Sequence, residues 1–165
     1  MILGILSDTH GRSEIAERAI ALLLDRGSEF IIHCGDVGDG VLELLPSGKS
    51  AFVFGNTDYD VEGLRRLAKS LDVRCFDHGG IVELGGKRIA VAHGDQSRIM
   101  NGFLADEVYY LLTGHTHVAH DRRPGATRMI NPGALHRAVR KTVAVLDLET
   151  DVLKFETLID PGGER

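Results

Sequence analysis

The chain has 165 residues, of which 43% are apolar and none is Trp, and its formal net charge is −5. This length suits one domain with a sizeable core of Ile, Leu, Val and Ala, as in an α/β protein, so we expect residues 1–160 to form a single domain and residues 161–165 a frayed tail. The acidic balance argues against stable nucleic-acid binding, and no apolar run approaches the roughly 20 residues of a membrane span.

The first half of the chain alternates between strand and helix patterns. Ile2–Leu6 and Phe30–Cys34 read as buried strands, and the helix between them is expected to have Ser13 as its N-cap and Gly27 after its last turn. A strand, helix and strand of these lengths form a parallel unit with a right-handed crossover. The other elements expected in this half are one or two helical turns at Val41–Leu45, a strand at Ala51–Phe54, and a helix capped by Asp60 with Leu64, Leu67, Ala68 and Leu71 on one face.

The second half reads mostly as strands. Gly85-Gly86 separates the apolar runs Ile81–Leu84 and Lys87–Ala92, which predicts a hairpin. The segment 97–107 is expected to be a loop or a short helix. The remaining strands are expected at Val108–Leu112, Thr127–Ile130, Thr142–Leu146 and Val152–Leu158, with a turn at Thr150-Asp151 before the last. Two sheets packed face to face, with helices outside, accommodate both halves.

Seven polar side chains follow five of the predicted apolar strands. Each is an oxygen or nitrogen donor of a kind that binds metal ions, and together they are Asp8, His10, Asp36, Asn56, His93, His115 and His117. Open α/β sheets place their ligand sites at the carboxyl ends of strands. We therefore expect these seven donors to converge on one site.

The donor set indicates two transition-metal ions. Oxygen and imidazole donors without sulfur suit Mn²⁺, Fe²⁺ or Zn²⁺ better than Ca²⁺, which takes oxygen ligands alone. Seven donors are too many for one tetrahedral ion but suit two ions that share a carboxylate. Two divalent ions and the two carboxylates, Asp8 and Asp36, leave a positive site that attracts phosphate. Water bound there has a pKa lowered toward ~7 and supplies hydroxide as a nucleophile.

The ordered motifs Asp-x-His, Gly-Asp, Gly-Asn, His and Gly-His-x-His resemble the calcineurin-like metallophosphoesterase superfamily over Ile2 to about Leu158. Gly55-Asn56-Thr57-Asp58 and Asn131-Pro132-Gly133 resemble its small bacterial and archaeal phosphodiesterase branch. The resemblance implies a four-layer αββα sandwich of two mixed β-sheets flanked by helices. It also implies that one ion is held by Asp8, His10 and His117, that the other is held by Asn56, His93 and His115, and that Asp36 bridges them. Of these we assign catalytic roles to Asp36, Asn56 and His93.

Position 57 departs from the wider superfamily, because Thr57 stands where many members have a His that assists the leaving group. Thr cannot readily donate a proton at neutral pH, so this departure argues against efficient phosphomonoesterase chemistry. His120 or His136 could supply the proton instead, although exposed histidines are the simpler interpretation. We expect Thr57 to contact substrate.

A basic stretch follows the His-x-His motif. The segment from Val118 to Lys141 contains six basic residues and one acidic residue, which gives it a local charge of +5. One interpretation is an ordinary solvated face; the other is a rim that attracts an anionic substrate, with Arg122 and Arg123 as substrate-binding residues.

Other polar residues of the motifs have simpler interpretations. His33 is expected to be a buried structural histidine, Asp58 a turn-forming or outer carboxylate, and Asn131-Pro132-Gly133 a turn beside the metals. Asp8 and His10 interrupt the first apolar run, so no export signal is recognisable, and Cys34 and Cys75 form no Cys-x-x-Cys unit. From these observations we expect reduced thiols in a cytoplasmic protein.

The function predicted from these features is a binuclear phosphodiesterase in which a metal-bridging hydroxide attacks phosphorus. Mn²⁺ is the favoured ion, with Ni²⁺, Fe²⁺ and Zn²⁺ as alternatives, and the partner is a small phosphate-ester substrate. The sequence predicts no stable nucleic-acid or membrane partner and leaves a homo-oligomer open. The alternatives are a non-catalytic scaffold of the same fold, as in a retromer subunit that resembles this family, and a nucleotide pyrophosphatase. A scaffold would be expected to have lost one or more of the seven donors, all of which are present here.

Overall fold

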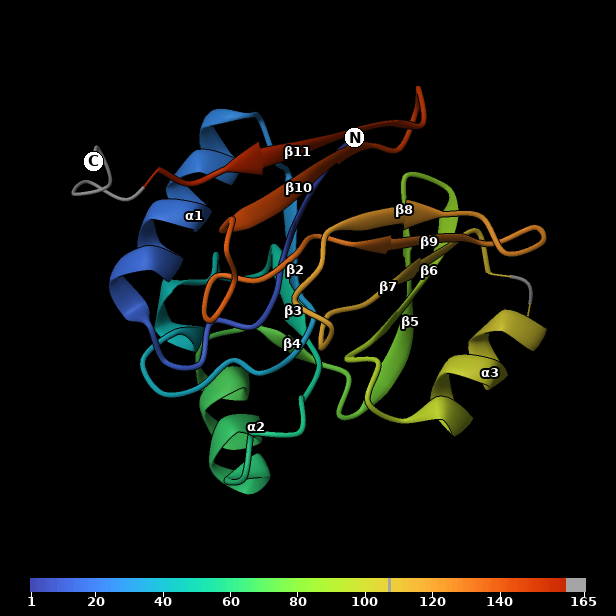
Figure 1. Cartoon of the computed structure of the whole chain (residues 1–165). Coiled ribbons are helices and arrows are strands. Elements are labelled where there is room, and N and C mark those ends of the chain that lie inside the picture. The colour runs from blue at the N-terminus through green and yellow to red at the C-terminus, as the bar shows by residue number, and fades with distance from the viewer. Residues whose placement is uncertain (107, 160–165) are drawn as a thin grey trace.

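A computed structural model describes residues 1–106 and 108–159, so the tail predicted at 161–165 lies outside the described residues. The chain forms two β-sheets with helices on their outer faces (Figure 1). The helical elements are α1 (Ser13–Asp25), the short 3₁₀ turn η1 (Leu42–Leu44), α2 (Val61–Ser70) and α3 (Ser97–Ala105). The strands are β1 (Ile2–Leu6), β2 (Phe30–His33), β3 (Ser50–Phe52), β4 (Arg74–Cys75), β5 (Gly79–Leu84), β6 (Lys87–Ala92), β7 (Tyr110–Leu112), β8 (His120–Arg122), β9 (Arg128–Asn131), β10 (Thr142–Asp147) and β11 (Val152–Thr157).

The two sheets are both mixed. The six-stranded sheet has the order β11-β10-β1-β2-β3-β4, with β1 to β4 parallel and β10 and β11 antiparallel to their neighbours. The five-stranded sheet has the order β5-β6-β7-β9-β8, with β6, β7 and β9 parallel and the outer strands antiparallel. This arrangement confirms the predicted fold class.

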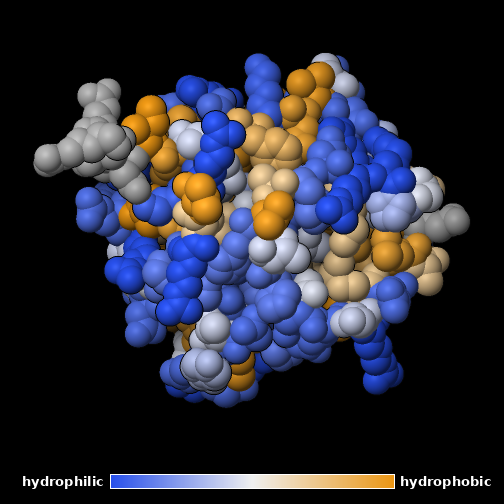
Figure 2. Space-filling view, viewed as in Figure 1, coloured by the Kyte–Doolittle hydropathy of each residue, from blue (hydrophilic) through white to orange (hydrophobic). Residues whose placement is uncertain are grey.

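Apolar side chains on alternate faces of the strands build three core layers. In β2, Ile31 packs with α1 and α2, whereas Phe30 and Ile32 pack between the two sheets. A third cluster joins the outer face of β6 and β7 to α3 through Met100 and neighbouring apolar residues. The layers are therefore helix, sheet, sheet and helix. On the face seen in Figure 2, apolar side chains are scattered rather than gathered into one patch.

The parallel strands fix the position of the predicted donors. β1, β2 and β3 run side by side in one sheet, and β6 and β7 run side by side in the other. The loops that follow these five strands contain all seven donors. The carboxyl ends of strands in both sheets therefore contribute to one edge of the molecule, which is where open α/β sheets place their ligand sites.

Several local predictions need correction. Helix α1 begins at Ser13 itself, with Arg12 in the cap position and no side-chain cap, because the first bond of the helical ladder is already accepted by the Arg12 carbonyl, from the Ala16 amide at 3.0 Å. Asp60 does cap α2, accepting the Gly63 amide at 2.9 Å. The helix α3, which begins at Ser97, confirms one of the two alternatives expected there, whereas the short strands β4 and β8 were not predicted. Among the described helices, none combines the length and apolar character that crossing a bilayer requires.

Candidate metal centre

The loops that carry the donors have an unusual backbone. Nine described non-glycine residues have a left-handed φ, and five of them are predicted metal ligands: Asp8, His10, Asp36, His115 and His117. That conformation costs an L-residue roughly 1–2 kcal/mol, so a fold retains it only where the surrounding structure enforces it. The strain is concentrated where the sequence predicted the site, which supports a functional role for these loops.

The first cluster joins the loop after β1 to the loop after β7. His117 Nε2 lies 3.1 Å from Asp8 Oδ1, and His10 Nε2 lies 4.0 Å from the same oxygen. The other oxygen, Asp8 Oδ2, accepts the His115 backbone amide at 3.1 Å and so ties the two loops together. The donor atoms of Asp8, His10 and His117 lie within 4.8 Å of one another, a spacing that one ion can span.

The second cluster gathers around the Asn56 side-chain oxygen. Asn56 Oδ1 lies 3.1 Å from His93 Nε2 and 3.0 Å from His115 Nδ1. The other nitrogen of His93, Nδ1, lies 2.8 Å from the Cys34 carbonyl, which can only accept a hydrogen bond, so Nδ1 carries the proton. In neutral His93 the lone pair of Nε2 therefore points toward the oxygens of the site, as it does in metal-ligating histidines held by a backbone carbonyl.

Asp36 lies between the two clusters. Its Oδ2 atom is 3.5 Å from His10 Nε2 in the first cluster and 3.4 Å from His93 Nε2 in the second. Its Oδ1 atom accepts the Thr57 amide at 2.8 Å, which fixes the carboxylate plane. Asp8 is also central, since its donor atoms lie within 4.8 Å of those of Asp36 and His93. One carboxylate oxygen thus faces nitrogen donors of both clusters.

The ionisation of the centre follows from these contacts. Burial alone would raise the pKa of Asp36, but hydrogen bonds from His93 and the Thr57 amide outweigh it and hold that pKa well below its usual range. Burial alone would lower the pKa of His93, but the contact with Asp36 and the Cys34 carbonyl outweighs it and raises that pKa. A positive charge at His93 Nε2 is therefore favoured by its surroundings, and a metal cation meets the same demand as a proton.

Two glycines let the ligand loops approach one another. A Cβ atom at Gly55 would lie 2.1 Å from Asp36 Oδ1, and one at Gly114 would lie 2.0 Å from Ser7 Oγ and 2.8 Å from Asp8 Oδ2. No side chain fits at such distances. The glycines of Gly-Asn and Gly-His-x-His are thus required by the close packing of the loops against the two carboxylates.

Asp58 holds two ligand loops together. Its buried carboxylate accepts the amides of Val37 at 2.9 Å, Gly38 at 3.0 Å and Gly55 at 2.8 Å. These amides flank Asp36 on one loop and precede Asn56 on the other. This contact confirms an outer structural role for Asp58 rather than a ligand role.

Asn131 supports the His-x-His loop in a similar way. Its buried amide group donates to the Gly114 carbonyl at 2.6 Å and to Thr116 Oγ1 at 3.1 Å, and its oxygen accepts the Gly133 amide at 2.9 Å. The sequence indicated a turn here but not that the Asn side chain itself positions the loop. Its place after a strand, before Pro-Gly, was the available signal.

His33 is a buried structural histidine, as predicted. Its Nδ1 accepts the Gly35 amide at 3.2 Å, so Nε2 carries the proton and donates to Thr9 Oγ1 at 2.9 Å. Thr9 Oγ1 in turn donates to the Val37 carbonyl at 2.6 Å. Burial, with the nearby His93, lowers the pKa of His33 to about 3 and keeps it neutral. This chain of hydrogen bonds links the loops after β1 and β2.

The donors present fit metal ions. Within the part of the chain that the structure describes, Asp8 Oδ1 and His10 Nε2 are buried and make no hydrogen bond, although both face the centre. Burying such groups without hydrogen bonds is costly, and a cation between them removes that cost. Nitrogen and oxygen donors in this ratio suit first-row divalent transition metals. The residues that could hold ions are the seven predicted from the sequence.

The candidate proton donors differ in position. Thr57 Oγ1 lies 3.3 Å from His10 Nδ1, so residue 57 lies at the centre. The His136 ring lies 5.3 Å from the His10 ring, whereas His120 belongs to β8. Burial and neighbouring cations lower the pKa of both His120 and His136. At neutral pH both are therefore neutral in this arrangement, which makes them poor acids.

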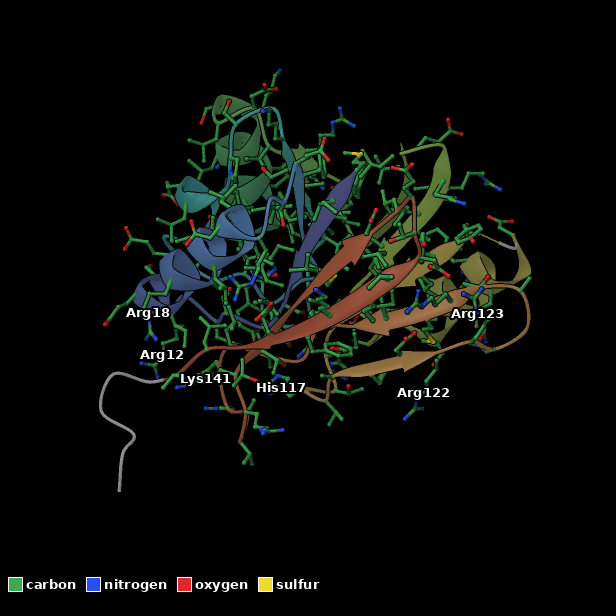
Figure 3. All side chains as sticks on the ribbon, turned by 90° about the horizontal axis from the view of Figure 1, so that it is seen from above. Arg12, Arg18, His117, Arg122, Arg123 and Lys141 are labelled. Carbon is green, nitrogen blue, oxygen red and sulfur yellow. The ribbon has the colours of Figure 1, made fainter. Side chains whose placement is uncertain are left out.

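The basic stretch is not a single rim. Arg128 pairs with Asp121 and Asp151, and Arg123 pairs with Asp151 at 3.1 Å. Figure 3 shows Arg122 and Arg123 well apart from His117, along β8 and the segment that follows. This placement does not support the prediction that Arg122 and Arg123 bind substrate. The local charge count missed the partner Asp151, which comes from a distant turn.

Comparisons with known proteins identify the family and the fold. The sequence model described as the calcineurin-like phosphoesterase superfamily domain matches residues 1–151. A phosphodiesterase of the archaeon Methanocaldococcus jannaschii is 26% identical over 156 residues, which cover 90% of this chain and 94% of that protein. The solved structure of an archaeal phosphodiesterase superposes with a TM-score of 0.86 at 26% identity, covering 96% of this chain and 100% of the other. A phosphoesterase of E. coli shares the fold with a TM-score of 0.67 at 21% identity, covering 96% of this chain and 100% of the other.

Proposed function

Because the chain belongs to the calcineurin-like phosphoesterase superfamily, and is thus a metal-dependent hydrolase of phosphate esters, we propose that it is a phosphodiesterase with a binuclear metal centre. One observation carries the proposal: seven oxygen and nitrogen donors from five strand ends gather around Asp8, Asp36 and Asn56, and two of their buried atoms, Asp8 Oδ1 and His10 Nε2, make no hydrogen bond among the described residues. One ion is assigned to Asp8, His10 and His117, the other to Asn56, His93 and His115, and Asp36 is the bridge.

When bound, the two ions, for which Mn²⁺ is the favoured identity, would polarise the phosphoryl oxygens and activate water for in-line attack on phosphorus. The chain itself supplies the positioning. The Cys34 carbonyl orients His93, the Thr57 amide orients Asp36, and the Asp58 carboxylate holds the loops on which Asp36 and Asn56 lie. Such supporting contacts keep ligands in the geometry that the reaction needs.

The substrate class follows from position 57. Thr57 lies against His10 but cannot readily protonate a departing alkoxide at neutral pH. Phosphodiesters with good leaving groups, such as aryl esters, need little protonation and are the substrates that this centre handles best. The archaeal relative is itself called a phosphodiesterase, in agreement with this assignment.

The test is hydrolysis of bis(p-nitrophenyl) phosphate by protein stripped with a chelator and then reloaded. Activity is expected to disappear on chelation and to return with Mn²⁺ more than with Mg²⁺, because imidazole ligands favour the softer ion. A nucleotide pyrophosphate assayed in parallel tests the alternative substrate class. Full turnover in stripped protein with chelator present would overturn metal dependence, and tight metal binding without turnover of any ester would indicate a scaffold.

A further inference from the structure

A cavity of about 600 Å³ lies beside the proposed metal centre, between the start of α1 and the segment 135–141. Its size is within the range of small-molecule sites, roughly 300–1,000 Å³. Gly11, which lines it, directly follows His10, and His136, which also lines it, has its ring 5.3 Å from the His10 ring. A substrate held at the centre can therefore extend into this cavity.

The cavity is basic. Arg12, Arg18 and Lys141 line it, against Glu14 as the one carboxylate among its lining residues. Figure 3 shows these three cations on the side of His117 opposite to Arg122 and Arg123. The positive charge beside the centre thus comes from two segments far apart in the sequence: Arg12 and Arg18 at the start of α1, and Lys141 at the end of the basic stretch.

The two arginines are not neutralised by the fold. Within residues 1–106 and 108–159, neither Arg12 nor Arg18 forms an ion pair; Arg18 donates to the Ile159 carbonyl, a contact that leaves its charge and most of its N–H groups available. By contrast, Arg26 and Arg65 each pair with a carboxylate. The first turn of α1 adds to the positive potential, because the helix begins at the cavity without a side-chain cap.

A second cavity, of about 790 Å³, flanks His10 on the side of Thr57 and has the opposite character. Its lining includes Asp39, Tyr59, Asp60 and Leu64 but no Lys or Arg. A diester bound at the centre has two arms, and these two cavities differ in charge. An anionic arm is attracted to the first cavity and repelled by the acids of the second.

We infer that the cavity lined by Arg12, Arg18 and Lys141 is an anion subsite, which binds a phosphate or similar charged group on one arm of a phosphodiester substrate. Guanidinium groups recognise phosphate with paired charge-assisted hydrogen bonds, and a lysine adds a point charge. The inference rests on the proposed function and extends it from diesters in general to diesters that carry a second anionic group.

The test uses two substrates with the same leaving group: p-nitrophenyl pentyl phosphate and p-nitrophenyl 5-phosphonopentyl phosphate, assayed with Mn²⁺-loaded protein. The wild type is expected to have a higher kcat/KM for the phosphono substrate, mainly through KM, and the preference is expected to fall at high salt. In Arg12→Gln/Arg18→Gln the ratio of the two kcat/KM values is expected to fall about tenfold, the effect of removing charge-assisted contacts at a partly exposed site. The matched control is Arg88→Gln/Arg98→Gln, which removes the same charge from exposed positions outside the cavity.

The outcomes separate this inference from the proposed function. If the wild type hydrolyses both diesters equally well and Arg12→Gln/Arg18→Gln leaves the ratio unchanged, the anion subsite is refuted while the phosphodiesterase remains. An equal loss of preference in the control variant would also refute it, since overall charge and not the cavity would then be responsible. If the loaded wild type hydrolyses neither diester, the proposed function itself fails.

Discussion

Replacing Asp58 with Asn is expected to destabilise both the fold and the metal centre, although the two side chains have the same shape. The Asp58 carboxylate accepts the Val37 and Gly38 amides through Oδ1 and the Gly55 amide through Oδ2. If the Asn oxygen accepts the Val37 and Gly38 amides, the NH₂ group of the Asn points toward the Gly55 amide, 2.8 Å away, so that two donors face each other. In the flipped Asn the oxygen accepts the Gly55 amide and the Val37 amide, which lies 3.2 Å from this position, but the NH₂ group then faces the Gly38 amide, which loses its acceptor.

The magnitude follows from one lost hydrogen bond. Gly55 is buried, and leaving a buried amide without a partner costs about 1–3 kcal/mol of the free energy of unfolding. Urea unfolding of metal-free protein, followed by circular dichroism, measures this cost. The control is Asp60→Asn two residues later, where the side chain caps α2 and Asn serves as an N-cap as well as Asp, so little change is expected.

The same substitution tests the link from Asp58 to function. Its amide partners lie on the loops that carry Asp36 and Asn56, so Asp58→Asn is expected to weaken metal binding about 10- to 100-fold, as other losses of supporting contacts do. Calorimetric titration with Mn²⁺ measures the affinity. If Asp58→Asn matches Asp60→Asn within about 0.5 kcal/mol in unfolding and in metal affinity, the supporting role given to this carboxylate is incorrect.

Three further predictions concern the centre and its surroundings. Asp36→Asn is expected to lose both ions and His115→Ala mainly one, as elemental analysis will show; two tightly bound ions in Asp36→Asn would contradict the bridging role. Thr57→His is expected to restore part of the rate enhancement of about 10²–10⁴-fold that a general acid gives, and to do so more for alkyl than for aryl diesters. If kcat/KM depends on leaving-group pKa with the same slope in the wild type and in Thr57→His, residue 57 does not assist the leaving group. Arg128→Met is expected to lower the free energy of unfolding by about 1–3 kcal/mol at pH 7. The hydrogen bond from Arg128 lowers the pKa of Asp121 in the folded protein, so this stabilisation is present above the pKa of Asp121 in the unfolded chain, near ~4, and is lost as the pH falls through its lower pKa in the folded protein. The effect of the mutation on urea unfolding must therefore shrink toward pH 3.

The strands that carry the site were predictable because they are buried on both faces. Ile2–Leu6 and Phe30–His33 are continuous apolar runs, and polar donors directly follow them. The position of a donor after a buried parallel strand is enough to predict the edge of the sheet on which it lies. Convergence of the seven donors therefore followed from the sequence before any distance was known.

The short strands were not predictable for the opposite reason. β4 has two residues and β8 is largely polar and exposed, so neither shows an apolar period. Their pairing depends on the neighbours β3 and β9, which are already fixed in their sheets. The start of α1 was mispredicted for a related reason. The preference of Ser for the N-cap position does not decide at which residue the preceding loop enters the helix.

The supporting contacts and the charge distribution required the three-dimensional structure. Two of the three amide partners of Asp58, Val37 and Gly38, come from a loop some 20 residues earlier, and nothing in the local pattern identifies them. The basic residues that lie beside the centre, Arg12 and Lys141, belong to opposite ends of the chain, whereas the local cluster at Arg122 and Arg123 lies apart from it. A charge count along the sequence cannot find such a site.

The arrangement of the two ions is the central claim, and anomalous diffraction from a crystal grown with Mn²⁺ tests it most directly. The account predicts two Mn²⁺ peaks on either side of Asp36, one in contact with Asp8, His10 and His117 and the other with Asn56, His93 and His115. A single peak in fully loaded crystals, or two peaks of which neither contacts Asp36, would contradict it.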